Sequence, residues 1–556
     1  MKKLKGLGRR TYNVLFHTHT VAGIVISFAL FVIFYAGAFA LFRHEIQQWE
    51  NPDYRQPLVK DLDIDHALLQ VDSVYGIDFT QRVNVNFPKP DMPVVKVYAQ
   101  QKTEDSTATF MGAYYSPNNE KIQDIKEPLT TVGDTIYFLH YFRQIPAVGL
   151  YISGFVALFF LFASITGLLI HWQHLLTKFY AFVKEGKWKV IWTNAHTVLG
   201  VISLPFQLMY AVTGAFFGLL ILVLLPVVAL KYDGDQSKVL SKIRPFDNYE
   251  IKVDAPAADN MSLAELGKQV LADYPEAHIN RAQIMNYGKE DAAALFAIDN
   301  NQGVHAMANI VVRMRDGRVL EEYTQRPEQS GYAYGVLAYI FKLHFATFGG
   351  IPLRILYFVL SMVTCFMIVS GILIWRTARD NKRYTFKQRL FHHRVTKWYL
   401  AICLSMFPAF AIIFVANKLV PIGLVDRVAT VNSIFFLSWL GLTLLGLLWN
   451  KYSQQNRNYL IIGGFLSLLI PIVNGIVTGD WIWNVWHTYE WVAYVDVFWL
   501  LAGLTALYIS FFHLKVKTTT DKPQAEEEAS ADTPVIEEEN TVEAPITMFK
   551  PKLGLD

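Results

Sequence analysis

The chain has very few of the residues that build covalent haem, iron–sulfur or zinc sites. Of its 556 residues only two are cysteines, Cys365 and Cys403, and both lie in apolar stretches. Neither belongs to a CxxC or CxxCH motif, which argues against c-type haem, an iron–sulfur cluster and a zinc ribbon. Because neither lies in a polar segment, the polar segments cannot contain disulfides.

The sequence also lacks a nucleotide-binding signature and a large charge of one sign. No G-x-G-x-x-G motif follows a strand-like run, so a flavin or nicotinamide site has no support. Charged residues make up 17% of the chain and the formal net charge is +3. Nothing in this balance indicates nucleic acid as a partner.

Apolar residues, in contrast, dominate the chain. They make up 53% of it, and the mean hydropathy is +0.26. Several apolar runs are long enough to cross the ~30 Å hydrocarbon core of a bilayer. We therefore predict a mostly α membrane protein with eight transmembrane helices near 20–42, 149–171, 199–230, 351–375, 398–416, 433–449, 459–476 and 492–513.

The distribution of Lys and Arg predicts the orientation of these spans. Residues 1–19 carry basic side chains and no acid, and the loop 376–397 carries eight basic residues and one acid. Such segments face the cytoplasm. The basic loop 172–198 joins them there. Two large polar segments then face outward, 43–148 and 231–350, and both termini are cytoplasmic.

The two ends of the chain have further features. The basic start and the apolar run after it resemble a signal peptide, but the run is 23 residues long and 39–42 is a poor cleavage site. We expect an uncleaved first helix, in the inner (cytoplasmic) membrane of a bacterium. After Lys517 the chain is acidic and rich in Pro, Ala, Ser and Thr, which predicts a disordered tail.

A histidine-containing element occurs twice. The sequence His-Thr-Val-Ala-Gly at 19–23 returns as His-Thr-Val-Leu-Gly at 196–200, and both copies open an apolar stretch. Eighteen residues after each histidine comes the triplet Gly-Ala-Phe, at 37–39 and 214–216. Such self-similarity indicates an internal duplication.

A second element repeats in step with the first. A Leu-His pair precedes an apolar helix at His140 and at His344. Twenty-seven residues after each histidine lies the glycine of a Thr-Gly or Ser-Gly pair, Gly167 and Gly371. The duplication therefore predicts four histidines at the ends of four membrane helices, two at each bilayer face.

Paired imidazoles in a helix bundle can ligate haem. Neutral imidazole is an axial ligand of haem iron, and helix bundles build cofactor sites from side chains on facing helices. Ionisable groups in a membrane are costly and tend to be functional. We predict two b-type haems, with His19 and His196 as inner axial ligands of the iron and His140 and His344 as outer ones. A single such histidine would more often bond to lipid or water.

Other histidines compete for the inner site. His171 ends the second span where the repeat has Trp375, and it is an alternative or additional partner to His19 as the inner ligand. His174 follows it in the sequence. His17 precedes His19 by two residues, so the two side chains point to different faces of a helix.

The remaining polar and aromatic side chains have less specific interpretations. His44 is expected at the interface or near a substrate, and His392 and His393 in the basic loop are expected to contact solvent or lipid phosphate. Four tryptophans between 481 and 491 indicate an interfacial aromatic belt. A quinol pocket there with His487 is a less favoured alternative.

The two outward segments look alike. In the second, a capping box at 262–265 opens a short helix, and strands are expected near 278–286, 292–299, 306–314 and 318–323. In the first, a helix near 64–74 precedes strands near 82–87, 94–100 and 108–115. Each segment is predicted to form a small α+β domain.

The two H-x-x-x-G helix openings, the two Leu-His entries, the Thr-Gly and Ser-Gly pairs and the helix-plus-sheet segments together resemble the PepSY-associated transmembrane family. This family includes siderophore-linked membrane ferric reductases. The resemblance covers about 17–376. It implies PepSY-like outer domains, b-type haems held by the four repeated histidines, and reduction of iron chelates at the outer face.

We therefore expect a haem b electron-transfer protein that reduces ferric chelates or siderophores in iron acquisition. Its electron donor would be separate, either a membrane quinol or a cytoplasmic reductase. One difficulty is that Pro146 and Gly149 place His140 close to the outer surface, which would leave the two haems far apart unless both tilt inward. The alternative is a non-enzymatic PepSY membrane protein that binds peptides or regulates an extracellular protease. Spans five to eight lie outside the resemblance and have no assigned role.

Overall fold

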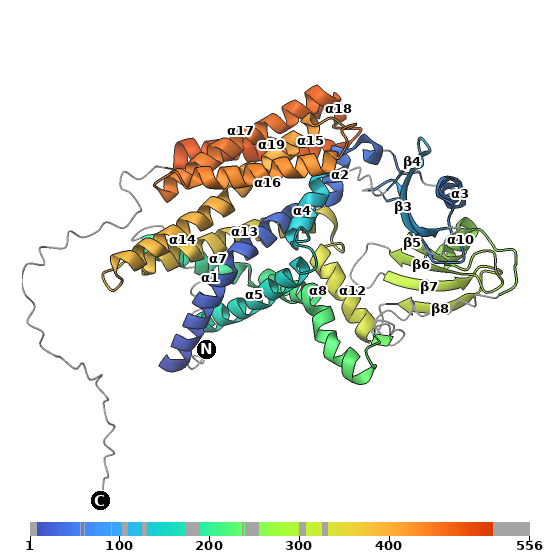
Figure 1. Cartoon of the computed structure of the whole chain (residues 1–556), viewed down its shortest axis with the longest axis horizontal. Coiled ribbons are helices and arrows are strands. Elements are labelled where there is room, and N and C mark those ends of the chain that lie inside the picture. Colours follow the sequence, from blue (N-terminus) through green and yellow to red (C-terminus); the bar gives the residue numbers. More distant parts are fainter. Residues whose placement is uncertain are drawn as a thin grey trace, which may run out of the picture.

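The computed structural model consists of a large helical part beside a smaller sheet domain (Figure 1). It describes residues 8–55, 57–59, 62–89, 92–102, 109–124, 131–172, 188–235, 238–239, 255–299, 307–324 and 332–514. The predicted acidic tail and His174 lie outside these described residues.

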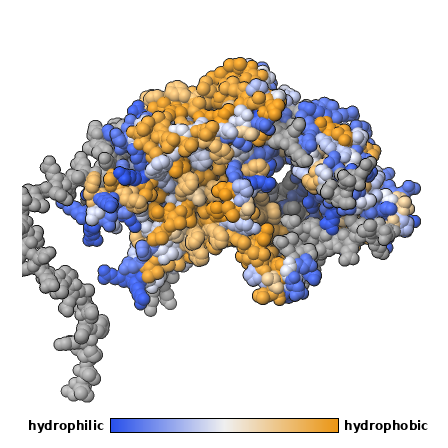
Figure 2. Space-filling view, viewed as in Figure 1, coloured by the Kyte–Doolittle hydropathy of each residue, from blue (hydrophilic) through white to orange (hydrophobic). Residues whose placement is uncertain are grey.

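Eight helices in the described part of the chain are long and apolar enough to cross a membrane, which confirms the predicted number. Figure 2 shows hydrophobic residues gathered over the helical part and hydrophilic residues over the sheet domain. The spans are Arg9–Ala40, Gly149–His171, Leu204–Lys231, Gly350–Ala378, Phe386–Leu419, Arg427–Gly446, Tyr452–Thr478 and Glu490–His513.

The first four spans form one bundle with several shorter helices. The spans are α1 (Arg9–Ala40), α5 (Gly149–His171), α8 (Leu204–Lys231) and α13 (Gly350–Ala378). Helices α5 and α8 cross closely at Gly154 and Gly218. A Cβ on Gly218 would lie only 2.4 Å from the Cα of Gly154, so the crossing requires glycine there. The shorter helices are α2 (Arg43–Glu50), α4 (Val132–His140), α7 (Trp188–Ile202) and α12 (Tyr332–Phe345).

The last four spans pack against the first bundle through aromatic rings. Tyr35 of α1 contacts Phe410, with ring centroids 4.9 Å apart, and Phe39 stacks on Trp499 at 5.8 Å. Figure 1 shows these helices on one side of α1 and α13. They comprise α14 (Phe386–Leu404), α15 (Met406–Leu419), α16 (Arg427–Gly446), α17 (Tyr452–Thr478), α18 (Ile482–Val485), α19 (Glu490–Tyr508) and η4 (Ile509–His513).

The two polar segments join edge to edge in one antiparallel sheet. Each contributes a helix and four strands to the described structure, and the strand order is β4-β3-β2-β1-β5-β6-β7-β8. The central contact is between the segments, where β1 pairs with β5. The first segment contains α3 (Ile64–Tyr75), β1 (Val83–Asn86), β2 (Val95–Gln101), β3 (Thr109–Ser116) and β4 (Lys121–Asp124); the second contains α10 (Leu263–Asp273), β5 (His278–Met285), β6 (Ala293–Asp299), β7 (Met307–Arg313) and β8 (Val319–Thr324).

The helices and the main strands of this domain are those that the sequence predicts, whereas β4 and the joining of the two segments are not predicted from it. Alternate residues of the strands are buried beneath α3 and α10, which share one hydrophobic core. The predicted capping box of Ser262 and Glu265 is present. Asp65 of α3 also accepts hydrogen bonds from the backbone N–H groups of Leu263 (2.7 Å) and Ala264 (2.9 Å), so one segment caps the helix of the other.

A disulfide across the β1–β5 boundary tests this shared sheet. Asn84 and Gln283 are directly opposed in the register. Opposed residues have Cα atoms about 4.5–5.5 Å apart, within the range that a disulfide requires. We expect the pair Asn84→Cys and Gln283→Cys to crosslink under mild oxidation, as detected by peptide mapping without reduction.

The matched control combines Asn84→Cys with Asn309→Cys. Asn309 lies on β7, three strands from β1, a separation of about 14 Å. Equal crosslinking in both pairs, or none in the first, would contradict the pairing of the two segments.

Candidate histidine-pair sites

The first pair of histidines lies between the two repeats. The ring centroids of His19 on α1 and His196 on α7 are 6.2 Å apart. Each Nδ1 is 2.9 Å from a backbone carbonyl oxygen, that of Ala163 on α5 for His19 and that of Met367 on α13 for His196. The two carbonyl partners occupy corresponding positions of the duplication.

The repeated small-residue pairs accommodate these two rings. A Cβ on Gly167 would lie 3.1 Å from Cε1 of His19, and one on Gly371 would lie 3.2 Å from Cε1 of His196. The preceding hydroxyls, of Thr166 and Ser370, lie 3.5 and 3.3 Å from the respective Nδ1 atoms. The Thr-Gly and Ser-Gly pairs therefore provide a close seat for each imidazole.

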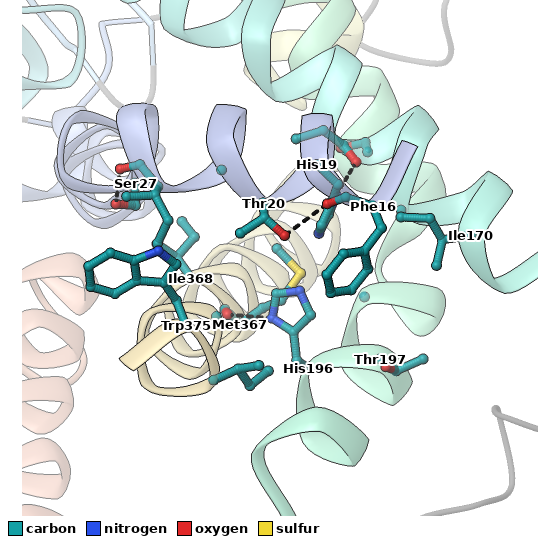
Figure 3. A pocket seen from close by; sticks show the side chains of 18 of the residues that line it. Phe16, His19, Thr20, Ser27, Ile170, His196, Thr197, Met367, Ile368 and Trp375 are labelled. Carbon is teal, nitrogen blue, oxygen red and sulfur yellow. Dashed lines mark hydrogen bonds between the residues drawn. The ribbon is translucent and has the colours of Figure 1, made fainter. Parts of the chain in front are cut away.

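A cavity of about 400 Å³ surrounds the first pair (Figure 3). This volume is within the range of small-molecule and cofactor sites. Gly23 and Gly200 line it, each one turn after its histidine, and the space that a Cβ on Gly23 would occupy has no neighbour within 4 Å. His171 and Arg379 line the cavity as well. Its wall is mostly apolar and takes residues from α1, α5, α7, α8 and α13.

The second pair joins His140 at the end of α4 with His344 on α12. Their ring centroids are 6.0 Å apart. Nδ1 of His140 lies 2.8 Å from the carbonyl oxygen of Ile33. A Cβ on Gly37 would lie only 2.6 Å from the same nitrogen, so the first Gly-Ala-Phe triplet leaves room for this ring.

His344 has a side-chain partner instead of a carbonyl. Its Nδ1 lies 2.8 Å from Oγ1 of Thr213. The Thr213 hydroxyl donates its own proton to the carbonyl oxygen of Met209, also at 2.8 Å. The hydroxyl oxygen is then the acceptor, and His344 donates to it.

All four histidines consequently share one tautomer. Each Nδ1–H donates a hydrogen bond, which leaves the lone pair of Nε2 available for a metal, as is usual for metal-binding histidines. Bonds from metal to imidazole nitrogen are about 2 Å long, so two imidazoles on opposite sides of one metal ion have ring centres roughly 6 Å apart. The measured 6.2 and 6.0 Å match this separation.

The second pair lies deeper in the bundle than the chain order suggests. The Ile33 carbonyl that holds His140 is seven residues before the end of α1, about 10 Å inside it. Helix α4 runs alongside α1 and brings His140 inward. The two pairs are about 21 Å apart along α1, measured from His19 to Ile33, so the expected wide separation is reduced.

The structure also places the competing histidines. The pairing with His196 favours His19, while His171 lines the same cavity from the end of α5. The expectation that His393 contacts solvent or lipid is wrong. Helix α14 already begins at Phe386, and His393 is buried with its Nδ1 2.6 Å from the hydroxyl of Tyr452.

The other singled-out side chains have partners outside the two pairs, although His17 lines the first cavity together with Trp375. His44 contacts Gln47, with 3.1 Å between Nδ1 and Oε1. The ring centroid of His392 is 5.0 Å from that of Trp375. In the predicted aromatic belt the rings of Trp481 and Trp483 stack at 5.2 Å.

Thr213 is a site residue that the sequence analysis missed. The two triplets are preceded by different residues, Ala36 before the first and Thr213 before the second. This difference between otherwise repeated segments is the feature of the sequence that could have pointed to Thr213. Its meaning depends on His344, which is 131 residues away.

A comparison with known protein families gives a match to this chain. The model of the PepSY-associated TM region matches residues 16–378. The chain belongs to this family. The matched region contains both histidine pairs and ends with the last residue of α13, so the four C-terminal spans lie outside it. No curated protein matches the chain significantly.

The partner of His344 can be removed without removing the histidine. We expect Thr213→Val, which preserves shape but deletes the acceptor, to weaken retention of a cofactor at the second pair by about 10–100-fold. Haem titration of the purified protein measures this effect. The control is Thr166→Val, because His19 keeps the Ala163 carbonyl. Equal losses in both variants would contradict the assignment of Thr213.

Proposed function

We propose that this PepSY family member is a haem b electron-transfer protein that reduces ferric chelates at the face of the membrane where its sheet domain lies. The observation that carries the proposal is the presence of two sites, each with two neighbouring imidazoles. Both pairs have the separation that one metal ion requires, and in all four rings Nδ1 is engaged and Nε2 is left for the metal.

The residues around the first pair fit a planar macrocycle. His19 and His196 would hold the iron, and the glycines Gly23 and Gly200 leave space in the cavity wall. Haem iron with two imidazole ligands supplies one-electron redox chemistry. At the second pair His140 and His344 would be the corresponding ligands, and the rings of Tyr210 and Phe217 each lie with their centroids 5.0 Å from that of His344.

The charge pattern supports an orientation for this electron path. The basic N-terminus and the basic turn after α13 belong on the cytoplasmic side of a bacterial inner membrane. Figure 1 shows the start of α1 at the end of the bundle away from the sheet domain. The first pair is then the inner pair and the second the outer pair, nearer to the sheet domain.

The proposed reaction is the one-electron reduction of chelated Fe³⁺ to Fe²⁺ at the outer face. Hard oxygen donors bind Fe³⁺ more strongly than Fe²⁺, so reduction favours release of the iron. The electron comes from a separate donor, a membrane quinol or a cytoplasmic reductase, on the side of the inner pair. The iron chelate is the substrate and the sheet domain is the surface beside it.

The ligand assignment is tested by alanine variants. The wild type should bind two six-coordinate b haems, extractable by acid acetone because no CxxCH motif is present. His140→Ala and His344→Ala should each remove the same haem, and His196→Ala should remove the other. A pyridine haemochrome assay and the optical spectra measure both results.

His19→Ala and His171→Ala are the deciding comparison for the inner site. The geometry predicts loss of the inner haem in the first variant and its retention in the second. The reverse result would assign His171 as the ligand. A colourless wild type prepared with sufficient haem would sink the haem proposal and favour a non-enzymatic PepSY protein that binds peptides or regulates a protease.

The substrate is tested by reoxidation. Protein reduced with dithionite and freed of excess reductant should be reoxidised by a ferric chelate, with Fe²⁺ captured by ferrozine. His344→Ala, which retains the inner haem, is the control and should be reoxidised much more slowly. If the reduced protein ignores ferric hydroxamates, catecholates and citrate but reacts with a quinone, the iron assignment fails.

A further inference from the structure

A buried carboxylate caps the helix that carries His140. Glu50, the last residue of α2, faces the first turn of α4. Its Oε2 accepts hydrogen bonds from the backbone N–H groups of Thr131 (2.5 Å) and Val132 (2.9 Å), and its Oε1 accepts one from Gly133 (2.7 Å). Three N–H groups at the helix start, which have no partner within the helix, are thereby satisfied.

Side chains from the four C-terminal spans complete this contact. Asn417 on α15 donates to Oε2 of Glu50 at 3.1 Å. Arg427, the first residue of α16, donates to the hydroxyl of Thr131 at 3.1 Å and to the backbone carbonyl of Asn417. One turn further along α4, Thr135 hydrogen-bonds to Asn432 of α16. Helices α15 and α16, which lie outside the family match, therefore both form hydrogen bonds at the first turn of α4.

Helix α2 is fixed by the same spans. The indole N–H of Trp49 donates to Oδ1 of Asp496 on α19 at 2.8 Å. Lys418 of α15 donates to the backbone carbonyl of Trp49 at 2.6 Å, and its ammonium lies 4.1 Å from the centre of the Trp49 ring. The residue next to Glu50 is thus anchored to two C-terminal helices.

Burial of the Glu50 carboxylate is unfavourable unless hydrogen bonds compensate for the lost contact with water. Burial raises the pKa of Glu50 to about 7, while the backbone donors at 131–133 act in the opposite direction. A buried carboxylate is tolerated only where its oxygens are satisfied. Here all four groups that donate to it are N–H groups, and the ionised form accepts from all of them.

The contact at the start of α4 is transmitted to its other end. The helix is nine residues long, so Val132 and His140 are separated by about 12 Å of continuous hydrogen-bonded backbone. Gly133 allows α4 to lie close to α2, since a Cβ there would be 3.0 Å from the carbonyl oxygen of Arg43. A shift of the first turn would move the His140 ring relative to His344.

We propose that the four C-terminal spans hold α4 in place through Glu50, Asn417 and Arg427, and that Glu50 is a positioning residue for the outer histidine pair. This inference rests on the proposed haem function of that pair. It assigns the region beyond the family match a role in setting the geometry of the outer site.

The test compares Glu50→Gln and Asn417→Ala with the wild type, all as full-length protein loaded with haem. In Glu50→Gln an NH₂ group replaces one carboxylate oxygen. This group cannot accept hydrogen bonds from the surrounding N–H donors. The matched control is Glu265→Gln, the same change in a residue that caps α10 of the sheet domain. The readouts are the low-spin EPR signals and midpoint potentials of the two haems and hydrogen exchange in the peptide 131–140. His344→Ala identifies the outer-haem signal.

The proposal expects a shifted or lost outer-haem signal in Glu50→Gln and Asn417→Ala, with the inner-haem signal unchanged. It also expects about fivefold faster exchange at the start of α4, as for loss of a helix cap. The control should change neither readout. If Glu50→Gln loses both haems, the outer-haem signal of the milder variant Asn417→Ala tests the positioning role instead.

Unchanged outer-haem signals in both variants of a haem-loaded protein would overturn the positioning role and leave the proposed function standing. Faster exchange with an unchanged outer-haem signal would have the same consequence. Loss of both haems in both variants would overturn the selectivity for the outer pair. A wild type that binds no haem would overturn the proposed function and this inference together.

Discussion

The hydrogen bond from each histidine Nδ1 is the interaction on which the arrangement of this bundle depends. Three of these bonds end on carbonyl oxygens, of Ala163, Met367 and Ile33, and the fourth ends on the Thr213 hydroxyl. Each joins a histidine to a helix other than its own. Each ring must lie close to the helix that carries its acceptor. The duplication has glycines and small hydroxyl residues at these contacts, because a larger side chain would collide with the ring.

The duplication makes the two halves of the family region dependent on each other. Each histidine pair takes one ring from each half, and the sheet is continuous only because β1 of the first half pairs with β5 of the second. The capping of α10 by Asp65 is a further bond between the halves. Neither half contains a complete site or a complete sheet.

The four C-terminal spans make further contacts with this bundle, on its other side. They pack against α1 by aromatic rings within the membrane and contact α2 and α4 by polar side chains near the sheet domain. Glu50 is at the centre of the polar contact. A helix start needs acceptors for its free N–H groups, and here the acceptor is supported by neighbouring helices.

Periodicity, capping and spacing along the sequence determine a large part of this protein. The eight spans, the capping box at Ser262 and the seven predicted strands depend on local patterns, and every strand lies within one residue of its expected bounds. The spacing of the duplication singles out His19, His140, His196 and His344 as equivalent positions. These features are local in the chain, so they can be read from it.

Only the tertiary structure decides how these elements meet. Partners in the two pairs are 177 and 204 residues apart in the chain, the inward course of α4 depends on its packing against α1, and the burial of His393 depends on Tyr452. The same is true of Thr213 and Glu50, whose neighbours in the sequence give no sign of their partners. Such contacts are selected by packing and by the satisfaction of buried polar groups over the whole bundle, and no local pattern encodes them.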